Sequence, residues 1–225
     1  MKKVFRYMGV FRLSQHCCEL HIIINGLPRH RFPFEDDCIP RNGIYFLLEK
    51  GEYGHDADRI VRVGTHTGPN QLRSRLKQHF VQENKDRSIF RKNIGRCLLN
   101  RDKDPYASVW ELDFTTREAK LNNGHLINPA YQLTIESRVS DYFQKHFSFC
   151  VLGIEDKTER LSLESRLIST LSLCDECAPS VQWLGMSSPH EKIRRSGLWQ
   201  VNELYKEPLN NQDFDRIEVL ASESR

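Results

Sequence analysis

The feature that most restricts the fold of this chain is a pair of β-rich runs, Gly43–Leu48 and Arg59–Gly64, joined by a polar stretch. Their branched and aromatic side chains favour strands. Two strands with a connection of this length predict an antiparallel hairpin with a long loop over residues 49–58. A third run, Phe147–Ile154, is apolar enough to be a central strand of the same sheet.

Helical patterns follow the hairpin. After Pro69-Asn70, the residues Leu72, Leu76 and Phe80 recur at four-residue spacing, which predicts a helix beginning near Gln71. A second helix is expected over Ser88–Asn100, with Ser88 as its N-cap. Further helices are expected after Pro129 and over Glu159–Leu171. The fold class is therefore α+β, with a small, mainly antiparallel three-stranded sheet flanked by helices.

The rest of the chain is organised around this unit. Residues 1–41 are expected to be an N-terminal extension, with a short strand at His21–Ile24 and a loop over Pro28–Pro40. Residues 42–205 form the predicted main domain. An insertion over 101–146 contains a predicted strand at Val109–Phe114, and residues 206–225 are expected to be a C-terminal tail.

Composition agrees with a folded domain: apolar residues make up 39% of the 225 residues and charged residues 28%. No run of about 18 apolar residues is present, and no signal-peptide pattern is recognised. We therefore expect a cytoplasmic protein whose seven cysteines are reduced thiols. One pair, Cys174 and Cys177, has the spacing of half a zinc site, which Cys17 and Cys18 could complete; the alternative is a structural or incidental turn.

Positive charge is concentrated in one segment. Residues 59–101 contain eleven Lys and Arg against two acids, a net charge of +9, whereas the whole chain carries only +3. Such a run is either a solvated face or a surface that binds a phosphate backbone. Because the charges lie on two successive helices, we favour nucleic-acid binding. The candidate binding residues are Arg62, Arg73, Lys77, Arg87, Arg91 and Lys92.

The predicted helix Glu159–Leu171 has one charged residue on its apolar side. Glu164 falls inside the apolar arc that Leu163, Leu167 and Ile168 define on a helical wheel. A carboxylate facing a core is costly unless it is paired with a cation. Either a nearby Arg neutralises Glu164, or the carboxylate binds a metal ion or transfers a proton.

Taken together, these pieces resemble the GIY-YIG nucleases. The resemblance is carried by Gly43-Ile44-Tyr45, by a second strand ending in Arg62-Val63-Gly64, by the helical run Arg75-Leu76-Lys77-Gln78-His79-Phe80, and by the lone Glu164 on a late helix. It covers about residues 42–204. It implies an endonuclease that cuts phosphodiester bonds, of DNA more than RNA, with Mg²⁺ or Mn²⁺. A homodimer is compatible with the sequence.

The resemblance also implies roles. Tyr45 matches the tyrosine of the first strand, Arg75 the cation that contacts the scissile phosphate, His79 the histidine one turn later, and Glu164 the metal ligand. The family's second tyrosine is replaced by Arg62. We therefore expect His66, whose ordinary pKa is near neutrality, to share the activation of water with Tyr45.

Some assignments remain alternatives. Gln200 or Asn202 matches the asparagine that often follows the last helix in this family, and Trp183 and Trp199 are expected to pack in the core rather than to stack on bases. Two rival functions are a nucleic-acid-binding module that has lost catalysis and a zinc-stabilised interaction domain built around Cys174 and Cys177.

Overall fold

The computed structural model describes the backbone of residues 2–224 and the side chains of residues 14–224. Four antiparallel strands form one sheet in the order β1-β4-β2-β3. The strands are β1 His30–Arg31, β2 Gly43–Gly54, β3 Ala57–Gly64 and β4 Phe147–Gly153. The α+β prediction with a mainly antiparallel sheet is confirmed, but the sheet has four strands instead of three because His30 and Arg31 pair with β4.

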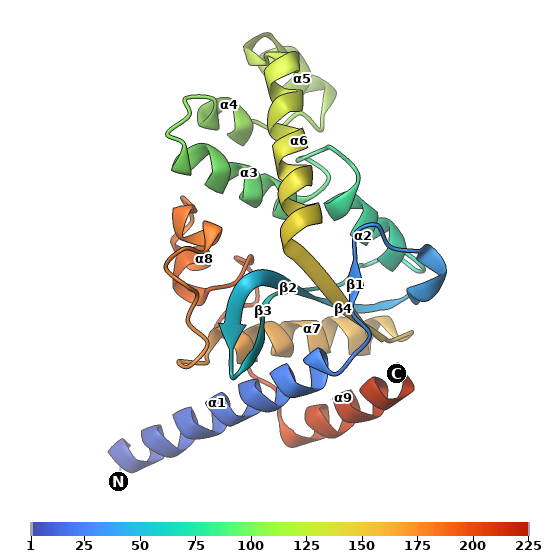
Figure 1. Cartoon of the computed structure of the whole chain (residues 1–225), viewed down its shortest axis with the longest axis vertical. Coiled ribbons are helices and arrows are strands. Elements are labelled where there is room, and N and C mark those ends of the chain that lie inside the picture. The colour runs from blue at the N-terminus through green and yellow to red at the C-terminus, as the bar shows by residue number, and fades with distance from the viewer. Residues whose placement is uncertain (1, 225) are drawn as a thin grey trace.

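Helices cover both faces of the sheet. The α-helices are α1 Lys2–Asn25, α2 Leu72–Phe80, α3 Ile89–Arg101, α4 Ala107–Glu111, α5 Arg117–Asn123, α6 Pro129–His146, α7 Lys157–Ser172, α8 Glu191–Ser196 and α9 Asn211–Glu223, and the 3₁₀ turns are η1 Asp36–Cys38, η2 Gly124–Leu126 and η3 Leu184–Ser187. In Figure 1, α2, α3 and α6 lie above the sheet, whereas α1, α7 and α9 lie below it. The four helices expected from the sequence are confirmed as α2, α3, α6 and α7.

Strand alternation divides the interior into two cores. Ile44 and Phe46 of β2 pack with α1, α7 and α9, in what we call the α7 core. Tyr45 and Leu47 point to the opposite face and pack with α2, α3 and α6, in the α3 core. Since both faces of β2 are buried over Gly43–Leu48, this part of the strand is apolar rather than alternating. Residues 206–225, expected as a tail, include α9, whose Phe214 enters the α7 core.

Two predicted strands are wrong. His21–Ile24 belongs to α1, because Cys17, Leu20 and Ile24 recur at helical spacing and all face the α7 core. Val109–Phe114 overlaps the short helix α4. There Trp110 is buried against α3 and its Nε1 donates to the Lys92 carbonyl 2.9 Å away, so tertiary packing overrides strand propensity.

The predicted long hairpin loop is also wrong. The strands continue to Gly54 and from Ala57, leaving a turn of two residues, His55 and Asp56. Both have positive φ, 52° and 58°, as in the turns that match the twist of a hairpin. The hairpin thus has a tight closed end at His55 and an open end at Tyr45 and Gly64, which lie opposite each other in the β2–β3 register.

Candidate active site

At the open end of the hairpin, Tyr45 crosses over Gly64. A Cβ atom at position 64 would lie 2.3 Å from the Tyr45 hydroxyl oxygen, so a side chain there would displace the phenol. This explains why a glycine ends the second strand. Because β3 is the edge strand of the sheet, Tyr45 lies on the strand next to the edge.

Tyr45 begins a buried chain of hydrogen bonds. Its Oη lies 2.8 Å from Nε2 of His79, and Nδ1 of His79 lies 2.8 Å from Oγ of Ser88. All three side chains are fully buried. Burial, followed by the positive charges of Arg75, Arg62 and Arg91, holds the pKa of His79 well below its usual range, so its imidazole is neutral at physiological pH.

Beside this chain a cavity of about 340 Å³ opens at the end of β3. It is lined by Thr65, His66, Thr67, Gln71, Ser74, Arg75 and Gln78. Arg75 reaches it from α2, with its guanidinium oriented by Oε1 of Gln78 at 2.9 Å and by the Arg87 carbonyl at 3.2 Å. His66, from the loop after β3, and Arg75, from α2, therefore share one cavity.

The geometry of His66 defines its protonation. Nδ1 lies 2.6 Å from the carbonyl oxygen of Gly68 and therefore donates to it. The lone pair is then on Nε2, where the Gly43 N–H approaches at the long distance of 3.4 Å. Burial, assisted by Arg160, lowers the pKa of His66. The imidazole is thus oriented as a base, by a partner on its other nitrogen.

Glu164 projects from α7 toward the same end of the sheet. Burial raises the pKa of its carboxyl, while the charge of Arg62 and a hydrogen bond from the Thr65 backbone N–H oppose that shift. Among the described residues, Glu164 takes part in none of the ion pairs. The expected nearby Arg is therefore present as the charge of Arg62, although it forms no ion pair with Glu164. A partly buried carboxylate near a polar cavity also fits a cation.

Arg62 does not line the cavity. Its side chain is buried, donates to the Trp199 carbonyl and lies over the Phe90 ring, with 4.7 Å between Cζ and the ring centroid. Its charge nevertheless acts on both His79 and Glu164. Arg62, which replaces the second tyrosine, therefore affects the site through its charge and not by lining the cavity.

Comparison with known families agrees with this geometry: the GIY-YIG domain matches residues 29–225. The chain belongs to the GIY-YIG domain family. This confirms the resemblance inferred from the motifs and indicates a nuclease-type function. No curated protein and no solved structure gave a match.

The basic segment of this GIY-YIG domain is less exposed than its sequence suggests. Arg59, Arg62, Lys85 and Arg91 are buried. Arg91 is fully enclosed by Glu136 and Ser140 and by the His79 carbonyl, so we leave it out of the proposed interface. Arg73 and Lys77 pair with Asp37 and Asp36, at 3.6 and 2.5 Å, and Lys92 donates to the Glu111 carbonyl.

Two cations remain well placed. In the described part of the chain, neither Arg75 nor Arg87 takes part in an ion pair, and the two are linked through the Arg87 carbonyl. Arg87 is exposed. These two arginines, at the cavity and beside it, are the strongest candidates for phosphate contacts.

Residues after the last sequence motif pack against the β2–β3 hairpin. Oε1 of Gln200 accepts from the Val63 N–H at 3.1 Å, whereas Asn202 is exposed, so of these two alternatives Gln200 is the one that bonds to β3. Trp183 and Trp199 are buried, as expected, and both donate from Nε1 to Oε2 of Glu49. The sequence predicts Ser88 as a helix N-cap, but it does not predict the hydrogen bond between Ser88 and His79.

Proposed function

We propose that this GIY-YIG domain is a metal-dependent endonuclease that hydrolyses phosphodiester bonds, with DNA as its substrate. One observation carries the proposal: Glu164 is partly buried, takes part in no ion pair among the described residues, and accepts from the backbone of Thr65, which lines the same polar cavity as Arg75 and His66. A protein that only bound phosphate would gain nothing from a carboxylate there, because it would repel the ligand.

The charge balance supports Mg²⁺ or Mn²⁺ as the cofactor. A single carboxylate with space for water suits a hard cation. Bound at Glu164, such a cation would supply positive charge to the phosphoryl oxygens and lower the pKa of a coordinated water. Arg75 adds a second positive charge across the cavity, directed at the developing negative charge of the transition state.

Water activation is assigned to His66, with Tyr45 in a supporting role. The Nδ1–H bond to Gly68 leaves Nε2 of His66 free to take a proton once substrate displaces the long Gly43 contact. Ser88 already accepts from the Arg91 N–H, so its hydroxyl can donate to Nδ1 of His79. Nε2–H of His79 then donates to Tyr45, which makes the phenol oxygen more tolerant of negative charge.

The test is cleavage of plasmid DNA with Mg²⁺, comparing the wild type with Glu164→Gln and with Glu159→Gln. Glu159 is a matched control, since it lies on the same helix and pairs with Arg216 at the surface. We expect Glu164→Gln to lose cleavage and retain binding, and Glu159→Gln to behave as the wild type. Cleavage by Glu164→Gln near the wild-type rate would show that the metal assignment is wrong.

A second candidate is a DNA-binding module without catalysis. It is favoured by the inward orientation of Arg62, which stands where the family has its second tyrosine but does not line the cavity. The same experiment separates the two: wild-type protein that binds DNA tightly but leaves it intact with both Mg²⁺ and Mn²⁺ would establish the binding module.

A further inference from the structure

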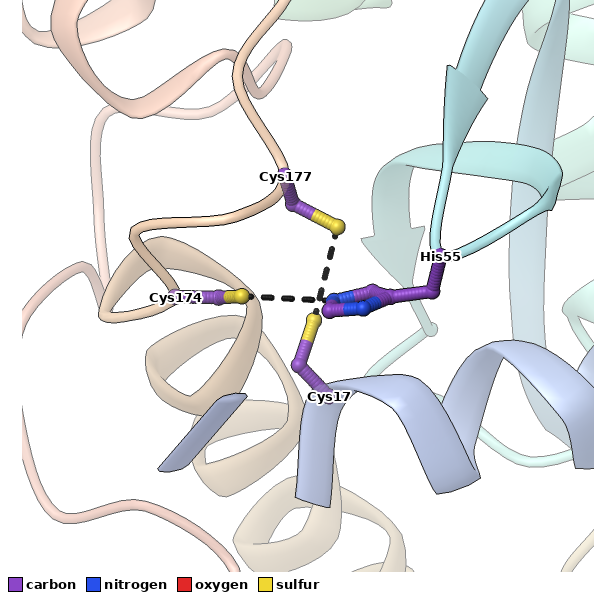
Figure 2. A group of neighbouring side chains, drawn as sticks. All are labelled: Cys17, His55, Cys174 and Cys177. Carbon is purple, nitrogen blue, oxygen red and sulfur yellow. Dashed lines mark hydrogen bonds between the residues drawn. The ribbon is translucent and has the colours of Figure 1, made fainter. Parts of the chain in front are cut away.

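At the closed end of the hairpin, four side chains from three distant segments converge on one point. Cys17 comes from α1, His55 from the hairpin turn, and Cys174 and Cys177 from the loop after α7 (Figure 2). One ligand atom from each lies within 4.8 Å of every other. The sequence allows Cys17 and Cys18 to complete a site at Cys174 and Cys177; the structure brings in Cys17 but has His55 in place of Cys18.

The separations match a tetrahedral metal site. With Zn–S bonds of about 2.3 Å, two sulfurs of a tetrahedron lie about 3.8 Å apart, and a sulfur and an imidazole nitrogen about 3.5 Å apart. Sγ of Cys17 and Sγ of Cys177 are separated by 3.7 Å, and Sγ of Cys174 and Nε2 of His55 by 3.3 Å. A disulfide would need about 2.05 Å between sulfurs, so the cluster has the spacing of ligands rather than of a bridge.

The surroundings orient the ligands. His55 directs Nε2 into the cluster, while its Nδ1 lies 3.8 Å from a carboxylate oxygen of Glu176, the outer partner that zinc-bound histidines commonly have. Neighbouring His21 cannot substitute for it, because its Nδ1 bonds to the Cys17 carbonyl and its Nε2 accepts from the Ile60 N–H. The cluster therefore selects one of two nearby imidazoles.

The backbone of the hairpin also accommodates the sulfurs. A Cβ atom at position 54 would lie 2.8 Å from Sγ of Cys177, so only glycine lets the turn pack against this thiol. His55 adopts a positive φ of 52°, which is uncommon for a residue other than glycine but tolerated by histidine. Cys17, Cys177 and the side chain of His55 are buried, whereas Cys174 is partly exposed, which leaves a route by which an ion could enter.

We propose that Cys17, His55, Cys174 and Cys177 bind one structural Zn²⁺. Three thiolates and one imidazole are a preferred ligand set for this ion, and four protein ligands leave no open position for catalysis. The family match begins at residue 29, so Cys17 lies outside it. The ion fastens α1 to the hairpin turn and to the end of α7. This proposal does not depend on the nuclease assignment, because it concerns different residues and a different ion.

The first experiment measures zinc in the full-length protein, purified under reducing conditions without chelators. We expect about one zinc per chain. Replacement by Co²⁺ should produce visible bands of tetrahedral geometry and a thiolate charge-transfer band. Reduced protein that takes up neither Zn²⁺ nor Co²⁺, or a disulfide among Cys17, Cys174 and Cys177 in freshly purified protein, would overturn the proposal.

Variants then test the ligand set. Cys177→Ser and His55→Asn should each raise the Kd for Zn²⁺ by about 100-fold or more, since even the loss of an outer partner costs about 10- to 100-fold. Asn tolerates the positive φ at position 55, so this variant should still fold if Cys177→Ser does not. Cys18→Ser is the matched control: it neighbours Cys17 on the same helix but is outside the cluster. Zinc affinity equal in Cys18→Ser and His55→Asn would count against His55.

Discussion

The two ends of the β2–β3 hairpin offer two different environments for a metal ion. At the open end, Glu164 lies beside a polar cavity with Arg75 and His66. At the closed end, three thiols and His55 surround one point. A single carboxylate leaves most coordination positions to water and substrate, whereas four protein ligands leave none. The same hairpin therefore separates a site suited to chemistry from one suited to stability.

The largest expected effect is a loss of cleavage when only the open end is altered. Glu164→Gln should lower the cleavage rate by about 10³-fold or more, because the cation's only charged ligand is lost. The zinc content should stay unchanged. A variant that lost both cleavage and zinc would show that the two ends are not independent.

The same substitution should not lower stability. The raised pKa of Glu164 means that the folded state disfavours its charged form. That penalty is absent below the unfolded-state pKa and fully present above the folded-state pKa. Gln removes it, so at neutral pH the Tm of Glu164→Gln should equal or exceed that of the wild type in calorimetry.

A substitution at the closed end should instead lower stability and leave cleavage nearly unchanged. Cys177→Ser should lower the free energy of unfolding by about 3 kcal/mol, since losing a structural metal is among the largest single-site effects. For a chain of this size that corresponds to a fall in Tm of about 6–12 °C. Below the new Tm, cleavage per folded molecule should change little. Unchanged Tm with the zinc removed would mean that the ion does not stabilise the domain.

The role of His66 sharpens the description of the open end. His66→Ala should lower the cleavage rate by about 10²-fold, the lower range for a positioned base. In the wild type, kcat/KM should rise with pH through an inflection below 6.5, because burial lowers the pKa of His66 and only the neutral form accepts a proton. His66→Ala should lose this inflection, whereas Arg75→Ala should be slow but keep it. An unaltered pH profile in His66→Ala would transfer the role of base to Tyr45.

The smallest expected effect concerns DNA affinity around the open end. Arg87→Ala should reduce the slope of log K against log salt concentration by about one unit, as the loss of one phosphate contact does in B-DNA. Arg216→Ala is the control, since Arg216 is also exposed but lies on α9 and pairs with Glu159. Equal slopes in Arg87→Ala and the wild type would exclude this face as the binding surface.

The basic residues of segment 59–101 show what the sequence predicts and what only the structure decides. The excess of positive charge over residues 59–101 was plain from the sequence, but it did not distinguish Arg91, which is fully buried with Glu136, from exposed Arg87. Burial depends on which helix packs opposite, and α6, which covers Arg91, begins almost 40 residues later.

In the described residues no helix has the length and apolar character needed to cross a membrane.

The sequence by itself determined the hairpin strands, the helices α2, α3, α6 and α7, and the family, because these rest on local periodicity and on motifs within short segments. It also singled out Glu164, since a charge inside an apolar arc is visible on one helix. Only the tertiary structure decided that His55 joins Cys17, Cys174 and Cys177, that Ser88 supports His79, and that Arg62 turns inward. Those contacts join elements far apart in the chain, and nothing in the local spacing of residues specifies them.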